Sequence, residues 1–158
     1  MAKRTGVLAG AILLCLIIGG LGGLITSPAI GSWYSTLVKP SFSPPNWLFA
    51  PVWTLLYILM GIALFLVLDN NIIKFDNKKA ALRAFSAQLI LNFLWTFFFF
   101  GLQLTWLAFT EIVILWIMIL CTMIKFWPIS RAAAYLLVPY ILWVTFASAL
   151  NFAVAWLN

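Results

Sequence analysis

Long apolar runs separated by short polar segments repeat along the chain. Five of them, at about 7–25, 47–68, 80–101, 104–124 and 132–157, reach the roughly 20 apolar residues that a helix needs to cross a bilayer core. Only a tight turn near residues 101–105 separates the third run from the fourth, so we expect these two to form an antiparallel hairpin. The pattern therefore predicts an all-α membrane protein, a bundle of five transmembrane helices forming a single domain over residues 1–158.

The segment after the first run indicates how that run ends. Lys3 and Arg4 precede the run, as they would in a signal peptide, but TSPAIGSW contains no convincing small-x-small cleavage site. Ser27 and Pro28 instead fit a helix stop. The connection that follows, about residues 27–46, is the longest and holds four prolines. Because proline fixes φ and restricts the residue before it, we expect this loop to be a stiff, partly extended lid.

Composition supports the membrane assignment and removes several kinds of chemistry. Hydrophobic residues make up 66% of the chain and charged residues 8%, against about 25% charged in soluble domains. There is no His, and the only acids are Asp69, Asp76 and Glu111, which excludes histidine-based triads and most zinc or iron sites. We predict no metal and no required cofactor. Cys15 and Cys121 lie inside apolar runs and fit small hydrophobic residues better than a disulfide.

The distribution of positive charge predicts the orientation in the membrane. A net charge of +6 would suggest nucleic acid as a partner of a soluble protein, but here the basic residues lie between apolar runs, so we expect no nucleic-acid partner. Lys39 alone falls on one side of the predicted membrane. The other side holds Lys3, Arg4, Lys74, Lys78, Lys79, Arg83, Lys125 and Arg131. The positive-inside rule then predicts a cytoplasmic N-terminus, with the first loop and the C-terminal Asn158 outside.

Two predicted spans carry amides and aromatic residues on one helical face. Gln88, Asn92 and Trp95 are four and three residues apart, and Trp143, Ala147 and Asn151 repeat every four. Polar amides at membrane depth need partners, so both faces should point inward. The amides either bond helix to helix or contact a ligand, and the pattern leaves both readings open.

Three further features suggest a site or close packing. Glu111 is the only acid well inside a span; it either carries a proton, as in a small exporter, or bonds a neighbouring helix as a neutral acid. Trp53 and Tyr57 share a face of the second span and are candidates for a pocket, whereas Trp47 fits an interfacial belt. The glycines at 19, 20, 22 and 23 let a helix of this chain, or of a second copy, approach closely.

The residues 33–61 carry a resemblance to a known family. Their pattern, WYxxLxKPSFxPPxWxFxPVWTxLYxxMG, resembles the signature of the translocator protein or tryptophan-rich sensory protein family (TspO/MBR), also known as peripheral-type benzodiazepine receptors. The likeness continues in QLILNFLW at 88–95, EIVILW at 111–116 and PYILWVTFASALN at 139–151, over almost the whole chain.

The resemblance implies a five-helix bundle, commonly a homodimer, with a pocket under the first loop. The pocket would bind porphyrins such as protoporphyrin IX or a haem-like tetrapyrrole, and isoquinoline or benzodiazepine-type ligands. By the resemblance, the ligand-binding residues would be Tyr34, Pro44, Trp53, Tyr57, Asn92, Trp95, Phe98, Trp143, Phe146, Ala147 and Leu150. Lys39, at the outer surface, would either meet a propionate or make a helix-end or lid contact.

Two departures from the family pattern refine the expectation. Phe42 stands where the family more often has Trp, which alters lid packing. The C-terminal ALNFAVAWLN has no Tyr followed by Lys or Arg, so it lacks the sterol motif proposed for animal members, and we expect weak or no sterol binding. The short chain and its charge bias fit a bacterial inner membrane.

Three hypotheses for function follow. The first is tetrapyrrole binding for transport, sensing or regulation, with stacking on Trp53 and Trp143. The second is catalytic: light-dependent porphyrin breakdown, in which the same two indoles donate electrons. The third is a small proton-coupled transporter that uses Glu111.

Overall fold

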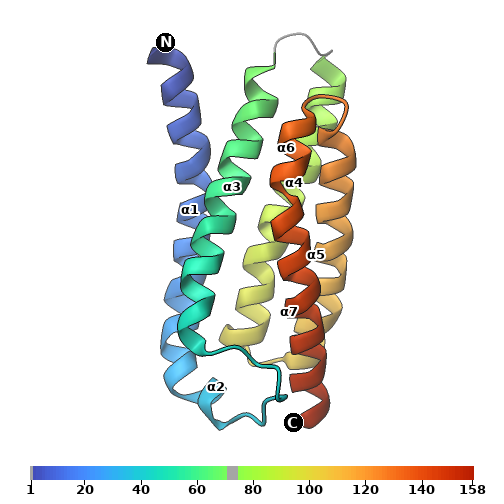
Figure 1. Cartoon of the computed structure of the whole chain (residues 1–158). Helices are drawn as coiled ribbons and strands as arrows, with labels where there is room; N and C mark the ends of the chain where they lie inside the picture. Colours follow the sequence, from blue (N-terminus) through green and yellow to red (C-terminus); the bar gives the residue numbers. More distant parts are fainter. Residues whose placement is uncertain (1, 71–74) are drawn as a thin grey trace.

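The protein is a bundle of five long helical stretches, seen in a computed structural model that describes residues 2–70 and 75–158 (Figure 1). Lys74 and the side chains of Lys3 and Asp76, used in the charge arguments above, lie outside the described part. The elements are α1 (Ala2–Gly31), α2 (Trp33–Thr36), η1 (Asn46–Leu48), α3 (Phe49–Asp69), α4 (Phe75–Thr96), η2 (Phe97–Gly101), α5 (Thr105–Phe126), α6 (Arg131–Leu136) and α7 (Val138–Leu157).

Within the described residues, five stretches are long and apolar enough to cross a membrane. They are Arg4–Gly31, Asn46–Asp69, Asn77–Gly101, Thr105–Phe126 and Arg131–Leu157. Their number and helical type confirm the predicted fold class, an all-helical integral membrane protein. Most observed limits lie within two residues of the predicted ones. The first stretch differs most, since it begins three residues earlier and ends six residues later than predicted, where the helix continues past the apolar core into the polar boundary.

The first helix corrects one prediction, since it does not stop at Pro28. α1 continues through Pro28 to Gly31. A proline in a helix costs the hydrogen bond to the carbonyl four residues earlier, but packing compensates here: Ala29 is 8% exposed and Ile30 lines the cavity described below. Ser32 Oγ then donates to the Pro28 carbonyl at 2.8 Å just past the end of the helix.

The third and fifth spans both depart from a uniform α-helix. α4 passes into η2, a π-helical turn from Phe97 to Gly101, before the chain turns back into α5. Gln103 supports this turn with a φ of 59°, the left-handed region. The last span breaks at Leu137, because Pro139 near the start of α7 has no amide hydrogen to continue the α6 ladder.

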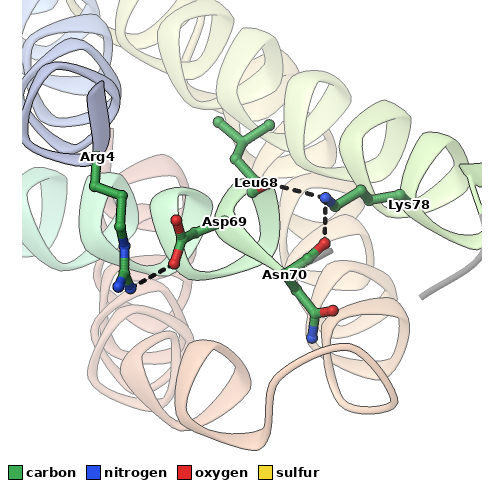
Figure 2. A network of polar contacts seen from close by, with 5 residues as sticks. All are labelled: Arg4, Leu68, Asp69, Asn70 and Lys78. Atoms are coloured by element: carbon green, nitrogen blue, oxygen red, sulfur yellow. Dashed lines mark hydrogen bonds and ion pairs between the residues drawn. The ribbon is translucent and has the colours of Figure 1, made fainter. Parts of the chain in front are cut away.

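Polar contacts link several helices at the end where the N-terminus lies. Figure 2 shows Arg4 of α1 paired with Asp69 at 2.5 Å, and Lys78 of α4 donating to the carbonyls of Leu68 and Asn70 at the end of α3. The Asn70 side chain donates to the Ile129 carbonyl at 2.7 Å, which adds the α5–α6 connection. We call this the basic end; its described cations are Arg4, Lys78, Lys79, Arg83, Lys125 and Arg131.

Close contact between α1 and α3 depends on one glycine. A Cβ atom at Gly61 would lie 2.5 Å from the Ile12 Cα, so only glycine permits this approach of two backbones. Around the bundle, α3 next packs on α6, and α7 packs on α5, which packs on α4. Away from the basic end, aromatic rings of α3 contact rings of α7. The ring centroids of Phe49 and Trp143 are 6.0 Å apart, and those of Trp53 and Tyr140 are 6.3 Å apart.

Candidate functional site

A cavity of about 500 Å³ lies between α1, α3 and α7, at the end opposite the basic end. Helices α1, α3 and α7 form its walls together with the last turns of α4 and η2, and α2 and η1 close it at the lid. Its lining is Leu16, Gly19, Gly20, Gly22, Gly23, Thr26, Ser27, Ile30, Tyr34, Asn46, Phe49, Ala50, Trp53, Thr54, Tyr57, Trp95, Thr96, Phe99, Phe100, Trp143, Ala147, Leu150 and Asn151. Among the described residues, α5 contributes none.

Half of the residues by which α1 lines the cavity are glycines, so part of this wall is peptide backbone. They are Gly19, Gly20, Gly22 and Gly23, beside Leu16, Thr26, Ser27 and Ile30. A Cβ at Gly19 would overlap the Tyr57 ring, whereas a Cβ at Gly20 or Gly23 would meet no atom within 4 Å. Gly19 therefore permits close packing, while Gly20 and Gly23 leave the wall open.

The opposite walls are aromatic and form a connected set of rings. Trp95 lies nearly parallel to Trp53 at 6.4 Å and to Phe99 at 5.5 Å. Trp53 also contacts Tyr57, with 5.8 Å between ring centroids. Such offset arrangements suit a large planar apolar guest, which gains both burial and ring contacts. The buried indole N–H of Trp143 has no hydrogen-bond partner among the described atoms, which leaves a donor beside the cavity.

Two buried amides hold the aromatic walls in place. The Tyr57 hydroxyl donates to Asn92 Oδ1 at 2.5 Å, and Asn92 Nδ2 donates to the Tyr140 hydroxyl at 2.9 Å. Trp95 Nε1 donates to Asn151 Oδ1 at 3.0 Å, while Asn151 Nδ2 donates to the Thr105 carbonyl at 2.9 Å. Both amides bond helix to helix, which confirms the first of the two readings left open by the sequence; Asn151 also lines the cavity, and its contact with a ligand stays a prediction.

The lid, residues 32–45, is fastened to the end of α7. Asn158 Oδ1 accepts from the Val38 amide at 2.9 Å, and Asn158 Nδ2 donates to the Val38 carbonyl at 3.0 Å. The ring of Phe42, the residue that departs from the family pattern, packs edge-on against Phe146 at 6.3 Å. Lys39 Nζ lies 4.8 Å from the centre of the Tyr34 ring, a cation–π contact within the lid. Burial raises the pKa of the Tyr34 hydroxyl, so it stays neutral.

Seven of the eleven predicted ligand-binding residues come together around the cavity. They are Tyr34, Trp53, Tyr57, Trp95, Trp143, Ala147 and Leu150. Pro44, Asn92, Phe98 and Phe146 are not among the lining residues. Asn92 lies behind Tyr57, and Phe146 supports Trp143 at a ring distance of 5.5 Å. Asn46, just beyond Pro45, contributes where Pro44 was expected.

The displacement of Phe98 has a clear cause in the backbone. A π-helix has more residues per turn than an α-helix, so the turn after Trp95 brings Phe99 and Phe100 to the cavity instead. Sequence reasoning also missed α1 as a wall. The cluster of glycines was the available signal, but it was interpreted only as helix packing.

Glu111 lies in α5, away from the cavity lining. Its side chain is 5% exposed, and neither carboxyl oxygen has a hydrogen-bond partner among the described residues. The structure therefore does not place it in the wall of the cavity.

Fold and site together define a small helical membrane protein with an aromatic cavity beneath a lid. The TspO/MBR family pattern matches residues 11–157. The chain is 46% identical to a tryptophan-rich protein TspO of Chlorobaculum tepidum, over 100% of this chain and 99% of that protein. It is 44% identical to a protein of the same name in Archaeoglobus fulgidus, over 96% of each chain. A translocator protein of Homo sapiens is 35% identical, over 77% of this chain and 72% of its own length. The chain belongs to the TspO/MBR family.

Proposed function

We propose that the chain binds a flat, largely apolar tetrapyrrole, such as protoporphyrin IX, in the cavity beneath the lid. The observation that carries the proposal is the cavity itself, in which three indoles and several phenyl rings face a wall formed in part by glycine backbone. Its volume of about 500 Å³ falls within the range of roughly 300–1,000 Å³ for ligand sites. Isoquinoline or benzodiazepine-type molecules share the same planar apolar character. Binding would serve tetrapyrrole transport, sensing or regulation.

Protoporphyrin IX titrated in the dark into protein in nanodiscs tests this proposal. The porphyrin absorbance band reports occupancy without depending on the tryptophans that are changed. Trp143→Phe removes the unpaired donor and part of the ring area, and we expect Kd to rise about 3- to 10-fold, the equivalent of one aromatic contact. The matched control is Trp156→Phe on the same helix, whose indole is 72% exposed and should have no effect. Non-saturable binding, or equal effects of both changes, would reject the cavity as the site.

A second candidate function is light-dependent porphyrin breakdown, and the ring contacts favour it. Trp53 lies between Tyr57 and Trp95, so an electron taken from this indole by an excited porphyrin can be replaced from a neighbouring ring. We expect illumination to bleach bound porphyrin, and Trp53→Phe with Trp143→Phe to slow bleaching more than tenfold at saturating porphyrin. Equal bleaching by the double variant would rule out these indoles as donors.

We further propose that the basic end is cytoplasmic, in a bacterial inner membrane. The described cations gather at that end, whereas Lys39 lies at the end with the lid and the C-terminus. A C-terminal fusion to a reporter active only outside the cytoplasm tests the orientation, and activity of a cytoplasmic reporter would reverse it.

A homodimer is also proposed. Gly6 and Gly10 of α1 are four residues apart, and no atom lies within 4 Å of the position of an added Cβ at either. A second copy could approach closely there. Cross-linking through Gly10→Cys tests this contact, and a monomer in native membranes would reject the dimer.

A further inference from the structure

The outward face of α4 near the basic end carries a second feature, distinct from the cavity. Lys79, Arg83, Ser86 and Ile90 are all exposed, and their spacings of four, three and four place them along one stripe of the helix. With Lys78, Leu82 and Ala87, which also belong to α4, they border a shallow, open depression of about 540 Å³ on the surface of this helix, called the groove below. α4 packs against α5 and α1 on its other sides, so this groove faces the surroundings of the bundle.

The groove has positive charge that the described protein does not neutralise. Lys78 donates to the carbonyls at the end of α3 and is thereby held in the bundle. Lys79 and Arg83 form no ion pair with the residues whose side chains are described, and among these residues no acid lines the groove. Asp69, at the same end of the bundle, is already paired with Arg4. Two cations are therefore available to an anion from outside.

The groove has cations at one end and apolar side chains at the other, an arrangement that fits an anion with an apolar tail. The membrane-spanning part of this stretch starts at Asn77. With a rise of about 1.5 Å per residue, Lys79 and Arg83 are about 6 Å apart along the axis and Ile90 lies about 16 Å beyond Lys79. The cations therefore lie at headgroup depth, Ser86 follows, and Leu82, Ala87 and Ile90 provide apolar surface at acyl-chain depth. A free phosphate would use the cations but leave the apolar part empty.

We propose that this groove is a binding site for an anionic phospholipid, of the phosphatidylglycerol or cardiolipin class. Arg83 and Lys79 hold the phosphate, because guanidinium groups donate two parallel hydrogen bonds to phosphate oxygens and both cations are attracted to an anionic headgroup. The acyl chain lies along the stripe that ends at Ile90. Lipid held here would brace α4, whose other faces form the bundle.

Native mass spectrometry in a neutral detergent tests the site. Phosphatidylglycerol and phosphatidylcholine are added at equal concentration to wild type, to Lys79→Gln/Arg83→Gln, and to the control Lys125→Gln/Arg131→Gln. The control removes two charges from the same end of the bundle but not from the groove. Each groove cation should contribute about fivefold, so we expect phosphatidylglycerol retention to fall roughly 30-fold in the groove variant alone. Phosphatidylcholine should bind weakly and equally to all three.

Three results would overturn the proposal. They are unchanged retention in the groove variant, equal loss in both variants, and displacement of the lipid by excess glycerol phosphate, which would identify a site for soluble anions. Lys79→Arg/Arg83→Lys keeps both charges and should retain the lipid within about twofold. Thermal midpoints in lipid-free detergent establish that each variant is folded. Should the double variant not fold, Arg83→Gln alone should reduce retention about fivefold, and no reduction would equally reject the site.

Discussion

Asn92 offers a stringent test of how the aromatic walls are held, because it links two tyrosines from different helices. Its amide accepts from Tyr57 and donates to Tyr140, and its side chain is 1% exposed. Asn92→Leu keeps the number and branching of the heavy atoms but removes both hydrogen bonds and leaves two hydroxyls in an apolar interior. Measured interhelical hydrogen bonds in membrane proteins average about 0.6 kcal/mol and reach about 1.7, and an unpaired buried polar group costs about 1–3 kcal/mol. We expect a loss of about 2–4 kcal/mol.

A double-mutant cycle isolates the free energy contributed by the hydrogen bond between Tyr57 and Asn92. Tyr57→Phe alone breaks one bond and should cost about 1 kcal/mol. In the Asn92→Leu background that bond is already lost, so the second change should cost about 1 kcal/mol less than it does alone. Reversible unfolding in mixed dodecylmaltoside and dodecyl sulfate micelles, followed by far-UV circular dichroism, gives the free energies. A cost below about 0.5 kcal/mol for Asn92→Leu, or additive costs in the cycle, would refute the linking role.

Three further predictions concern packing, the buried acid and the lid. Gly61→Ala should cost about 1–3 kcal/mol, because α1 must move away from α3. Gly23→Ala on α1 has open space and should change the free energy of unfolding by less than about 0.5 kcal/mol; equal effects of the two changes would contradict the close approach. Glu111→Leu should raise the free energy of unfolding by about 1 kcal/mol, because it removes a buried carboxyl that has no hydrogen-bond partner within residues 2–70 and 75–158. A loss of stability in the same unfolding assay would contradict this prediction. Asn158→Ala removes the two hydrogen bonds that hold Val38 of the lid. The rate constants for porphyrin association and dissociation, measured by stopped flow, should rise about threefold to tenfold. Unchanged rate constants would show that the lid does not limit entry.

The sequence predicts the five helices well because a bilayer imposes one demand on every span. A stretch of about 20 apolar residues has few alternatives to a helix in lipid, so the number and type of elements follow from the pattern. The end of α1 was predicted wrongly at Pro28 for a related reason. A proline ends a helix in water more readily than in a bundle, where neighbouring elements pack around the residues that follow it.

The site was predictable only where side chains carry the signal. Trp53, Tyr57 and Trp143 stand out as aromatic residues at helical spacing. The α1 wall, by contrast, is formed in part by residues without side chains, and the change from Phe98 to Phe99 and Phe100 depends on a π-turn that no periodicity in FFFFG reveals. Family resemblance named Asn92 as ligand-binding, while the structure gives it a supporting position behind the lining.

The glycine wall has a consequence for how a guest reaches the cavity. Gly20 and Gly23 line the cavity and are themselves exposed, so at these two positions a molecule dissolved among acyl chains meets peptide backbone between the exposed side chains of Ile17, Leu21 and Leu24. A porphyrin concentrates in the bilayer far above its aqueous level, and it is this lipid-dissolved pool that α1 borders. Occupancy of the cavity should then depend on the ratio of porphyrin to lipid. Adding empty vesicles at a fixed total amount of porphyrin should therefore lower the occupancy as much as lowering the amount of porphyrin does.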